Sequence, residues 1–173
     1  MIKFLEGSAM KTNIVLIGLM GAGKTSIGKR LAAILDMPFT DSDENIEKRY
    51  GSITELFKKG EEYFRDIESE IIQSMAVLDR VIMSTGGGVV LRPENMKALK
   101  EKGVIFYIKR PVEEILKSVE TDIRPLLKNN PEVLYKISEE REHLYLKYCD
   151  YVIDSTDIEK AVKTICSIWS KIS

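Results

Sequence analysis

The stretch from residue 13 to residue 25 constrains this chain most, because it joins a buried strand to a helix through a glycine-rich loop. Its Gly18-x-x-x-x-Gly23-Lys24-Thr25 spacing is that of a phosphate-binding P-loop. Glycines let backbone N–H groups approach phosphate oxygens, and the N-terminus of the following helix stabilises their negative charge. Lys24 can reach the β- and γ-phosphates, and the Thr25 hydroxyl can ligate Mg²⁺. A glycine-rich turn that binds nothing is the weaker alternative, because strand, loop, Lys-Thr pair and helix occur together.

The composition indicates one globular domain, with 44% hydrophobic and 31% charged residues in a chain of 173. A formal net charge of -1 offers no basic surface for nucleic acid or for an anionic membrane. Cys149 and Cys166 form no Cys-x-x-Cys pair, so we expect a reduced, cytoplasmic protein. No apolar run has the length needed to span a membrane. We expect residues 1–10 to be a leader or a cloning remnant before a single domain over 11–173.

Short apolar runs alternate with segments of helical periodicity along the chain. Strands are expected at 14–17, 39–40, 81–83, 104–108 and 151–153. Helices are expected at 25–35, after 42, from 53 to 78 with an interruption at Gly60, at 93–102, from 111 to about 119, at 132–148 and at 157–172. This alternation predicts the α/β class: a five-stranded parallel sheet with helices on both faces, in three α-β-α layers. Such sheets bind ligands at the carboxyl ends of their strands, so residues 18–25, residues 41–43, residues 84–88 and the end of the fourth strand are expected to converge at one edge.

Two acidic residues, Asp41 and Asp43, flank Ser42 directly after the second expected strand. An extended segment would point both carboxylates to the same side. One could hold the hydration shell of Mg²⁺, and the other could accept a hydrogen bond from an attacking hydroxyl group. The alternative is that Ser42 or Asp43 only caps the next helix. Further on, Ser52 and Glu55 have the spacing of a capping box.

Three consecutive glycines, Gly86, Gly87 and Gly88, follow Thr85 at the end of the third expected strand. Consecutive glycines cost backbone entropy, so close approach of a ligand explains them better than a permissive turn does. Ser84 stands where many P-loop proteins have an acidic residue linked to Mg²⁺, which leaves the carboxylate role to Asp41.

The remaining charged candidates are ambiguous when taken one at a time. Arg65 and Glu68 are three residues apart on an expected helix, a spacing typical of a surface ion pair of little energetic value. Arg141 lies among glutamates, as on a solvated helical face. Arg124 lies in a polar stretch at about 118–130 that we expect to form a mobile loop.

Taken together, these segments resemble the shikimate kinase family over nearly all of the chain from residue 11 onward. The resemblance rests on six segments in a fixed order, at 18–25, 41–43, 60–68, 84–88, 124–127 and 141–145. The P-loop is common to many families, whereas the combination of Phe-Arg-x-x-Glu, Gly-Gly-Gly and Arg-Pro-Leu-Leu is far more specific. The resemblance implies a P-loop fold of the nucleoside monophosphate kinase type. It also implies transfer of the ATP γ-phosphoryl group to the 3-hydroxyl of shikimate, a step of aromatic amino-acid (chorismate) biosynthesis.

The resemblance also implies a role for each matched residue. The catalytic residues would be Asp43, Lys24 and Arg124, with Arg124 on a mobile lid at about 118–130. Shikimate would be bound by Asp43, Arg65, Gly86, Gly87, Gly88 and Arg141. ATP would be bound by Gly21, Ala22, Gly23, Lys24, Thr25, Ser26, Lys117 and Arg124, although the family often has Arg at the position of Lys117. One Mg²⁺ ion would be bound by Thr25 and Asp41. The partners would be ATP and shikimate, without nucleic acid or membrane, and the protein would be a monomer.

Two other interpretations stay open at this point. A related kinase of gluconate or of a nucleoside monophosphate would keep the P-loop but need other residues around its acceptor. A nucleotide-binding regulatory module without catalysis would have no reason to combine Asp43, Arg65 and Arg141.

Overall fold

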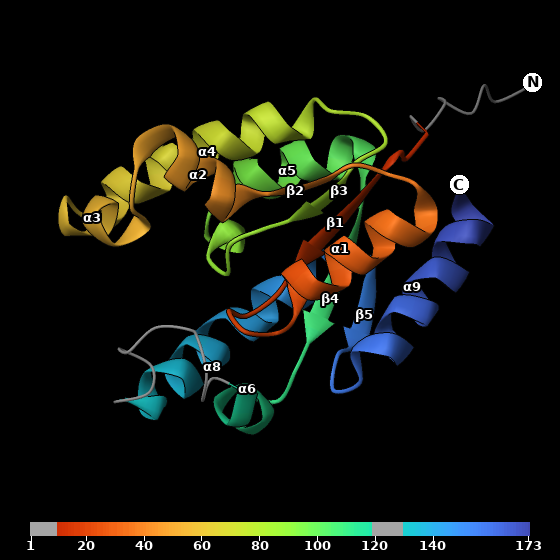
Figure 1. The fold of residues 1–173 in the computed structure, drawn as a ribbon. Coiled ribbons are helices and arrows are strands. Elements are labelled where there is room, and N and C mark those ends of the chain that lie inside the picture. Colours follow the sequence, from red (N-terminus) through yellow and green to blue (C-terminus); the bar gives the residue numbers. More distant parts are fainter. Residues whose placement is uncertain (1–9, 119–129) are drawn as a thin grey trace, which may run out of the picture.

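In the computed structural model, which describes residues 10–118 and 130–173, parallel strands form a five-stranded sheet with the order β2-β3-β1-β4-β5 (Figure 1). The strands are β1 (Asn13–Ile17), β2 (Phe39–Asp41), β3 (Ile82–Ser84), β4 (Gly103–Lys109) and β5 (Tyr151–Asp154). All four neighbouring pairs are parallel. The expected α/β class and the expected five strands are therefore confirmed.

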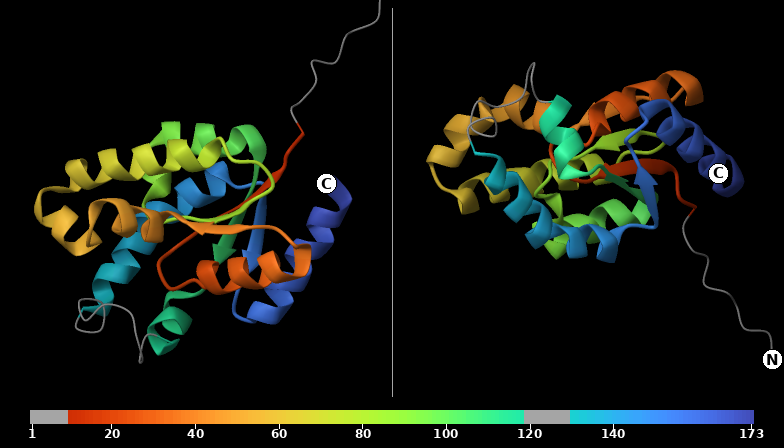
Figure 2. Two further views of the ribbon diagram at one scale, coloured as in Figure 1. Left: turned by 45° about the horizontal axis from the view of Figure 1, so that its top comes forward. Right: turned by 90° about the horizontal axis from the view of Figure 1, so that it is seen from below.

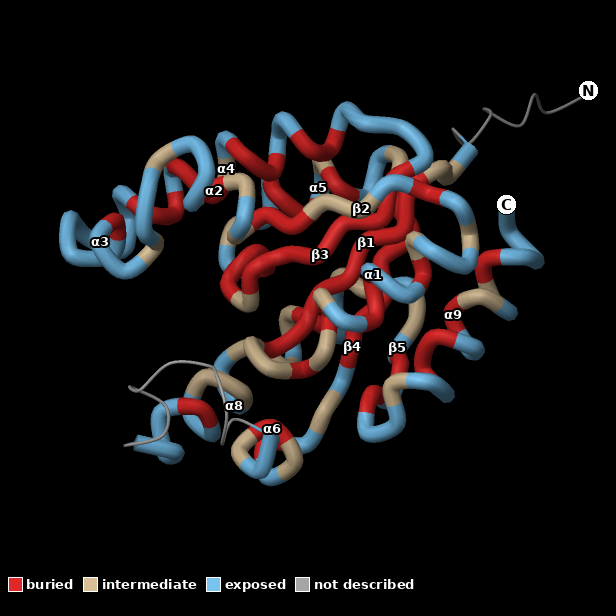
Figure 3. The backbone as a smooth tube through the Cα atoms, viewed as in Figure 1, coloured by how far each residue is buried: buried red, intermediate tan, exposed pale blue. Residues whose placement is uncertain are grey.

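Side chains of the central strand β1 alternate between two hydrophobic cores. Ile14 and Leu16 belong to one core, and Val15 and Ile17 belong to the other. This alternation follows from the two-residue repeat of a strand, and a run that is apolar at every position can therefore cover both faces of a parallel sheet. Figure 3 shows the three inner strands β1, β3 and β4 as largely buried, whereas the outer strands β2 and β5 are partly exposed.

Helices cover both faces of the sheet and complete three layers, as the two views in Figure 2 show. One layer contains α1 (Lys24–Leu35) and α9 (Ile158–Ile172), which pack against each other. The other layer contains α4 (Glu61–Ala76), α5 (Pro93–Lys102) and α8 (Pro131–Tyr148). The shorter helices are α2 (Ser42–Tyr50), α3 (Ile53–Lys58), α6 (Val112–Ser118) and the 3₁₀ turn η1 (Val89–Leu91). Both α2 and α3 pack on α4, at the far left of Figure 1.

The helix after β2 begins differently from the prediction. Asp41 is the N-cap residue of α2, and its carboxylate accepts hydrogen bonds from the backbone N–H groups of Asp43 and Glu44. The prediction that Ser42 or Asp43 caps this helix was therefore wrong. Asp43 lies in the first helical turn rather than in an extended segment, so the alternation of a strand does not explain where its carboxylate points.

Two other local predictions met different outcomes. Ser52 does precede α3, but its side chain makes no capping hydrogen bond, so the expected capping box with Glu55 is absent there. Gly60 separates α3 from α4 as expected, and its φ of 122° is a conformation that favours glycine. Within residues 10–118 and 130–173, no helix is both long and apolar enough to cross a membrane.

Gly103 connects α5 to β4 at a point where the backbones are crowded. A methyl group there would collide with the carbonyl oxygen of Leu99 and would lie 2.7 Å from Cγ2 of Val15. Gly103→Ala reduces the entropy of the unfolded chain, which alone stabilises by about 0.4–1 kcal/mol. We expect the collision to outweigh this gain and to lower the free energy of unfolding by about 1–3 kcal/mol, measured by urea denaturation. Glu101→Ala, at an exposed position of α5, is the control; equal stability of the two variants would contradict the prediction.

Candidate active site

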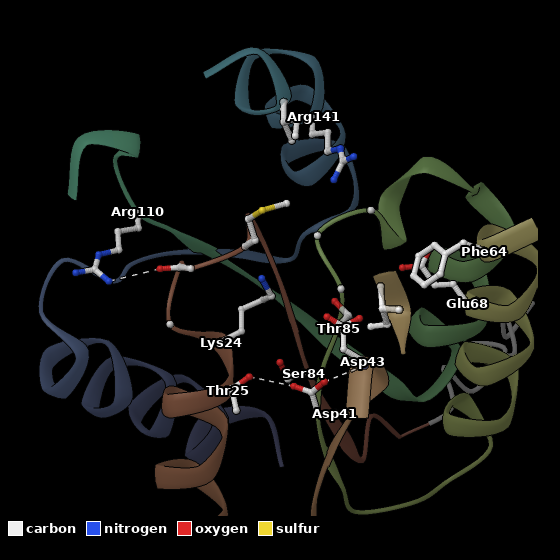
Figure 4. A pocket seen from close by; sticks show the side chains of 18 of the residues that line it. Lys24, Thr25, Asp41, Asp43, Phe64, Glu68, Ser84, Thr85, Arg110 and Arg141 are labelled. Carbon is white, nitrogen blue, oxygen red and sulfur yellow. Dashed lines mark hydrogen bonds between the residues drawn. The ribbon is translucent and has the colours of Figure 1, made fainter. Parts of the chain in front are cut away.

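The carboxyl ends of the strands open into a cavity of about 570 Å³. Five segments that are distant in sequence line it: the P-loop, Asp41 with Asp43, residues 84–88, α4 and α8 (Figure 4). The convergence predicted from the parallel sheet is thus present. Figure 4 places Lys24 and Thr25 on one side of the cavity, and Phe64, Glu68 and Arg141 on the other.

The P-loop has the backbone that its glycines permit. Gly21 and Gly23 have φ angles of 77° and 97°, which L side chains rarely adopt. A methyl group on Gly21 would also lie 2.8 Å from Cγ2 of Ile115 on α6. The ammonium group of Lys24 lies across the loop and donates to the carbonyl oxygens of Gly18 and Leu19, both at 2.7 Å. Lys24 is only 7% exposed, so a phosphate reaching it would leave most of its water behind.

Asp41 connects the P-loop helix to the start of α2. The Thr25 hydroxyl donates to Oδ2 of Asp41 at 3.0 Å, while Oδ1 accepts the N–H groups of Asp43 and Glu44. Ser84 lies beside Asp41 because these two residues are partners in the β2–β3 register. This hydroxyl and carboxylate set suits Mg²⁺, a hard cation that commonly takes one or two protein oxygens and completes its shell with water and phosphate oxygens. Accordingly, the described residues contain no cluster of three or more His, Cys, Asp and Glu side chains placed to hold a metal.

Asp43 and the glycines after β3 are packed together. A methyl group on Gly86 would lie 2.9 Å from Oδ1 of Asp43 and 3.1 Å from Oε1 of Glu68. The N–H group of Gly86 donates to the hydroxyl of Ser42 at 2.9 Å, which fixes the loop against the first turn of α2. The glycine at this position therefore leaves room for two carboxylates.

Arg65 and Glu68 form a buried ion pair, not the surface pair that the spacing alone indicates. Nη1 of Arg65 is 2.7 Å from Oε2 of Glu68, and the two side chains are 7% and 1% exposed. The guanidinium group also lies 5.2 Å from the ring centroid of Phe64 and 5.7 Å from that of Phe57. A methyl group on Gly88 would collide with this guanidinium group. Arg65 is therefore held in one orientation against the glycine loop.

Arg141 approaches the same loop from α8. A methyl group on Gly87 would lie 3.6 Å from Nη1 of Arg141, so this arginine also lines the cavity instead of pointing to solvent. One turn on, the hydroxyl of Tyr145 donates to the carbonyl oxygen of Gly87 at 2.6 Å, and its ring stacks on Tyr107. Burial raises the pKa of Tyr145 to about 12, against the opposing effect of the Arg141 charge. Tyr145 thus stays a hydrogen-bond donor at neutral pH.

Most of the predicted site residues line this cavity. They are Gly21, Gly23, Lys24, Thr25, Ser26, Asp41, Asp43, Arg65, Gly86, Gly87, Gly88 and Arg141. Ala22 is buried behind the loop, where its carbonyl oxygen accepts from the Ser155 hydroxyl at 2.7 Å. Lys117 does not line the cavity: its side chain is 74% exposed and pairs with Glu114 at 3.0 Å. Arg124 lies outside the described residues.

One cavity residue, Arg110, was missed by the reasoning from sequence. It directly follows β4, and Figure 4 shows it on the P-loop side of the cavity. The expected convergence of strand ends included the end of the fourth strand, but no residue there was singled out, because a lone arginine carries no spacing pattern.

Taken together, the three-layer fold, the P-loop and the cavity with a carboxylate and two arginines define a P-loop kinase. Comparison with known proteins gives the particular family. A family model described as shikimate kinase matches residues 20–169. A shikimate kinase of Thermodesulfovibrio yellowstonii is 45% identical over 168 residues, covering 93% of this chain and 96% of that relative. A shikimate kinase of Clostridium botulinum is 42% identical over 161 residues, covering 92% and 98%.

Solved structures agree with this result. The shikimate kinase from Acinetobacter baumannii, in complex with shikimate, superposes with a TM-score of 0.85 at 34% identity and covers 95% of this chain and 96% of that one. More distant structures share the fold alone, such as the YorR protein from Bacillus subtilis with a TM-score of 0.67 at 17% identity. The chain belongs to the shikimate kinase family.

The buried Arg65–Glu68 pair makes a prediction about stability. Glu68→Gln removes one charge of a desolvated pair, and we expect it to lower the free energy of unfolding by about 3–5 kcal/mol. Glu61 also contacts Arg65, at 3.5 Å, but its side chain is 61% exposed. Glu61→Gln, the matched control, should cost less than about 1 kcal/mol. Urea denaturation of both variants checks the difference, and a Glu68→Gln variant as stable as the control would contradict the burial argument.

Proposed function

We propose that this protein transfers the γ-phosphoryl group of ATP to the 3-hydroxyl of shikimate, a step of aromatic amino-acid biosynthesis. The observation that carries the proposal is the arrangement of Asp43, Arg65 and Arg141 around one glycine loop, facing a P-loop across the same cavity. Shikimate is a small carboxylated polyol, so it offers a carboxylate for the arginines and a hydroxyl for the aspartate. Family membership supports the same assignment.

Arg65 and Arg141 bind the shikimate carboxylate in this proposal. A guanidinium group presents two parallel N–H donors to a carboxylate, which an ammonium group cannot do. The contact of Arg65 with Glu68 fixes its orientation before substrate arrives, which reduces the entropy lost on binding. The N–H groups of Gly87 and Gly88 belong to the same substrate pocket.

Asp43 acts as the proton acceptor. As the acceptor oxygen forms its bond to the γ-phosphorus atom, the hydroxyl proton passes to the Asp43 carboxylate, and the bond from that phosphorus to the β–γ bridging oxygen breaks to release ADP. Lys24 and the amides of residues 21–26 bind the phosphates and stabilise the charge that develops on them. Arg124 is assigned a place over the phosphates when a lid at about 118–130 closes and excludes water.

Mg²⁺ is proposed as the one metal ion, with Thr25 and Asp41 as the residues that would hold it. It supplies neutralisation of charge on the β- and γ-phosphate oxygens when bound. Lys117 is assigned to the outer edge of the ATP site, from which its flexible stem can reach inward. We further propose that the enzyme acts as a monomer in the cytoplasm, which fits the unpaired thiols Cys149 and Cys166.

The function is tested by ADP release with Mg-ATP and one acceptor at a time: shikimate, quinate, gluconate or a nucleoside monophosphate. We expect strong stimulation by shikimate and little by the others. Stimulation by gluconate or a nucleoside monophosphate instead would keep the kinase class and overturn the roles of Arg65 and Arg141. Nucleotide binding without stimulation by any acceptor would favour a regulatory module.

Asp43→Asn tests the proton acceptor. We expect kcat to fall about 10²- to 10⁴-fold, because the amide cannot take the proton, while the KM for ATP stays near its wild-type value. Glu44→Gln changes the next, exposed carboxylate and should leave kcat within about twofold. Steady-state kinetics with both substrates varied gives these constants. An Asp43→Asn variant with wild-type kcat would remove Asp43 from the chemistry.

A further inference from the structure

Arg110 is a cation in the cavity whose hydrogen-bonding capacity is largely unused within the described residues. Its Nη1 lies 3.5 Å from the carbonyl oxygen of Gly21, a long contact for a charged donor. Its Nε–H group is buried and has no hydrogen-bond partner in the described part of the chain. Among the described residues no carboxylate lies within ion-pair distance of Arg110, whereas Arg65, whose Nε–H group is also without a partner, has Glu68 at 2.7 Å. Such a group is costly to bury unless something completes its bonds.

The backbone around Arg110 is fastened to the P-loop. The Ser155 N–H donates to the carbonyl oxygen of Lys109, and the Ser155 hydroxyl donates to that of Ala22. The end of β4, the P-loop and the loop before α9 are therefore joined by hydrogen bonds into one unit. The side chain of Arg110 extends from the end of β4 toward Gly21 of the P-loop. In Figure 4 it lies on the side of the cavity away from Arg141.

Arg110, Ser118 and Ile158 line the same cavity as the P-loop and the glycine loop, and none of the three is used by the proposed acceptor pocket or phosphate site. Ile158 also lies against Gly23, where a methyl group would be 3.5 Å from its Cδ1 atom. An apolar side chain beside a hydroxyl and a guanidinium group suits a flat heteroaromatic base with a polar edge, or the ribose next to it.

We propose that Arg110 binds the adenosine end of the nucleotide, with its guanidinium N–H groups on the base or the ribose. This inference rests on the proposed function, because the phosphates must lie on residues 21–26 for the adenosine to extend past Gly21. Lys117 cannot supply the same contact in its observed position, since its ammonium group pairs with Glu114 outside the cavity. Arg110 is thus a nucleotide-binding residue, distinct from the residues that bind the acceptor.

The test measures binding of ADP and of inorganic tripolyphosphate by calorimetry, without any acceptor present. For Arg110→Ala we expect ADP affinity to fall about 10- to 100-fold and tripolyphosphate affinity to stay within about twofold. Arg110→Lys keeps the charge and much of the stem, and ADP affinity should remain about fivefold or more below wild type. Lys109→Ala is the matched control, because Lys109 is adjacent in sequence but pairs with Glu142 at the surface.

Four outcomes would overturn the inference. Unchanged ADP affinity in both Arg110 variants would mean that the side chain does not bind the nucleotide. Wild-type ADP affinity in Arg110→Lys alone would mean that the contact needs only a positive charge and not a guanidinium group. An equal loss for tripolyphosphate would move the contact to the phosphates. An equal loss in Lys109→Ala would reduce the effect to overall charge. Direct binding separates this question from the acceptor, because a wrong assignment of shikimate would leave the ADP measurement intact.

Discussion

The site depends most on the hydrogen bonds of the Asp41 carboxylate, because they join the P-loop side of the cavity to the first turn of α2. One oxygen accepts the Thr25 hydroxyl, and the other accepts the N–H groups of Asp43 and Glu44. The N-terminus of α2 also stabilises a negative charge at this position. Any shift of Asp41 would therefore move a proposed metal ligand and the proposed proton acceptor together. A single carboxylate at a strand end thus fixes the spacing that phosphoryl transfer requires.

The glycine loop after β3 is the second constraint, and it is steric. Side chains from three helices meet there: Asp43 from α2, Arg65 and Glu68 from α4, and Arg141 from α8. Gly86 leaves room for the carboxylates of Asp43 and Glu68, and Gly88 leaves room for the guanidinium group of Arg65, so a larger residue at either position would displace a charged group. Arg65 is oriented before any substrate binds, since its guanidinium group lies against Phe64 and the glycine loop and pairs with Glu68.

The sequence predicted the parallel sheet, the helix order and most of the cavity, because P-loop spacing and strand alternation are local patterns with one structural solution. The sequence did not predict that the Arg65–Glu68 ion pair is buried. Arg65 and Glu68 have the spacing of a surface pair, but packing against Phe57 of α3 and against the glycine loop removes them from water. The cap of α2 was also missed, because Asp41, Ser42 and Asp43 are all good capping residues. Arg110 was missed because a single arginine after a strand carries no spacing pattern.

The two sides of the cavity are built by different layers of the fold. Helices α4 and α8, on one face of the sheet, carry the acceptor-side arginines. On the other face, α1 begins at the P-loop, and the loop before α9 is hydrogen-bonded to Ala22. The strand ends lie between these two layers, and there Asp41 and Ser84 are neighbours in the β2–β3 register. In the proposed reaction the phosphoryl group crosses this edge of the sheet, where the residues proposed for the metal lie. The nucleotide contact proposed for Arg110 lies apart from the buried Arg65–Glu68 pair, so the two sides of the cavity can be altered independently.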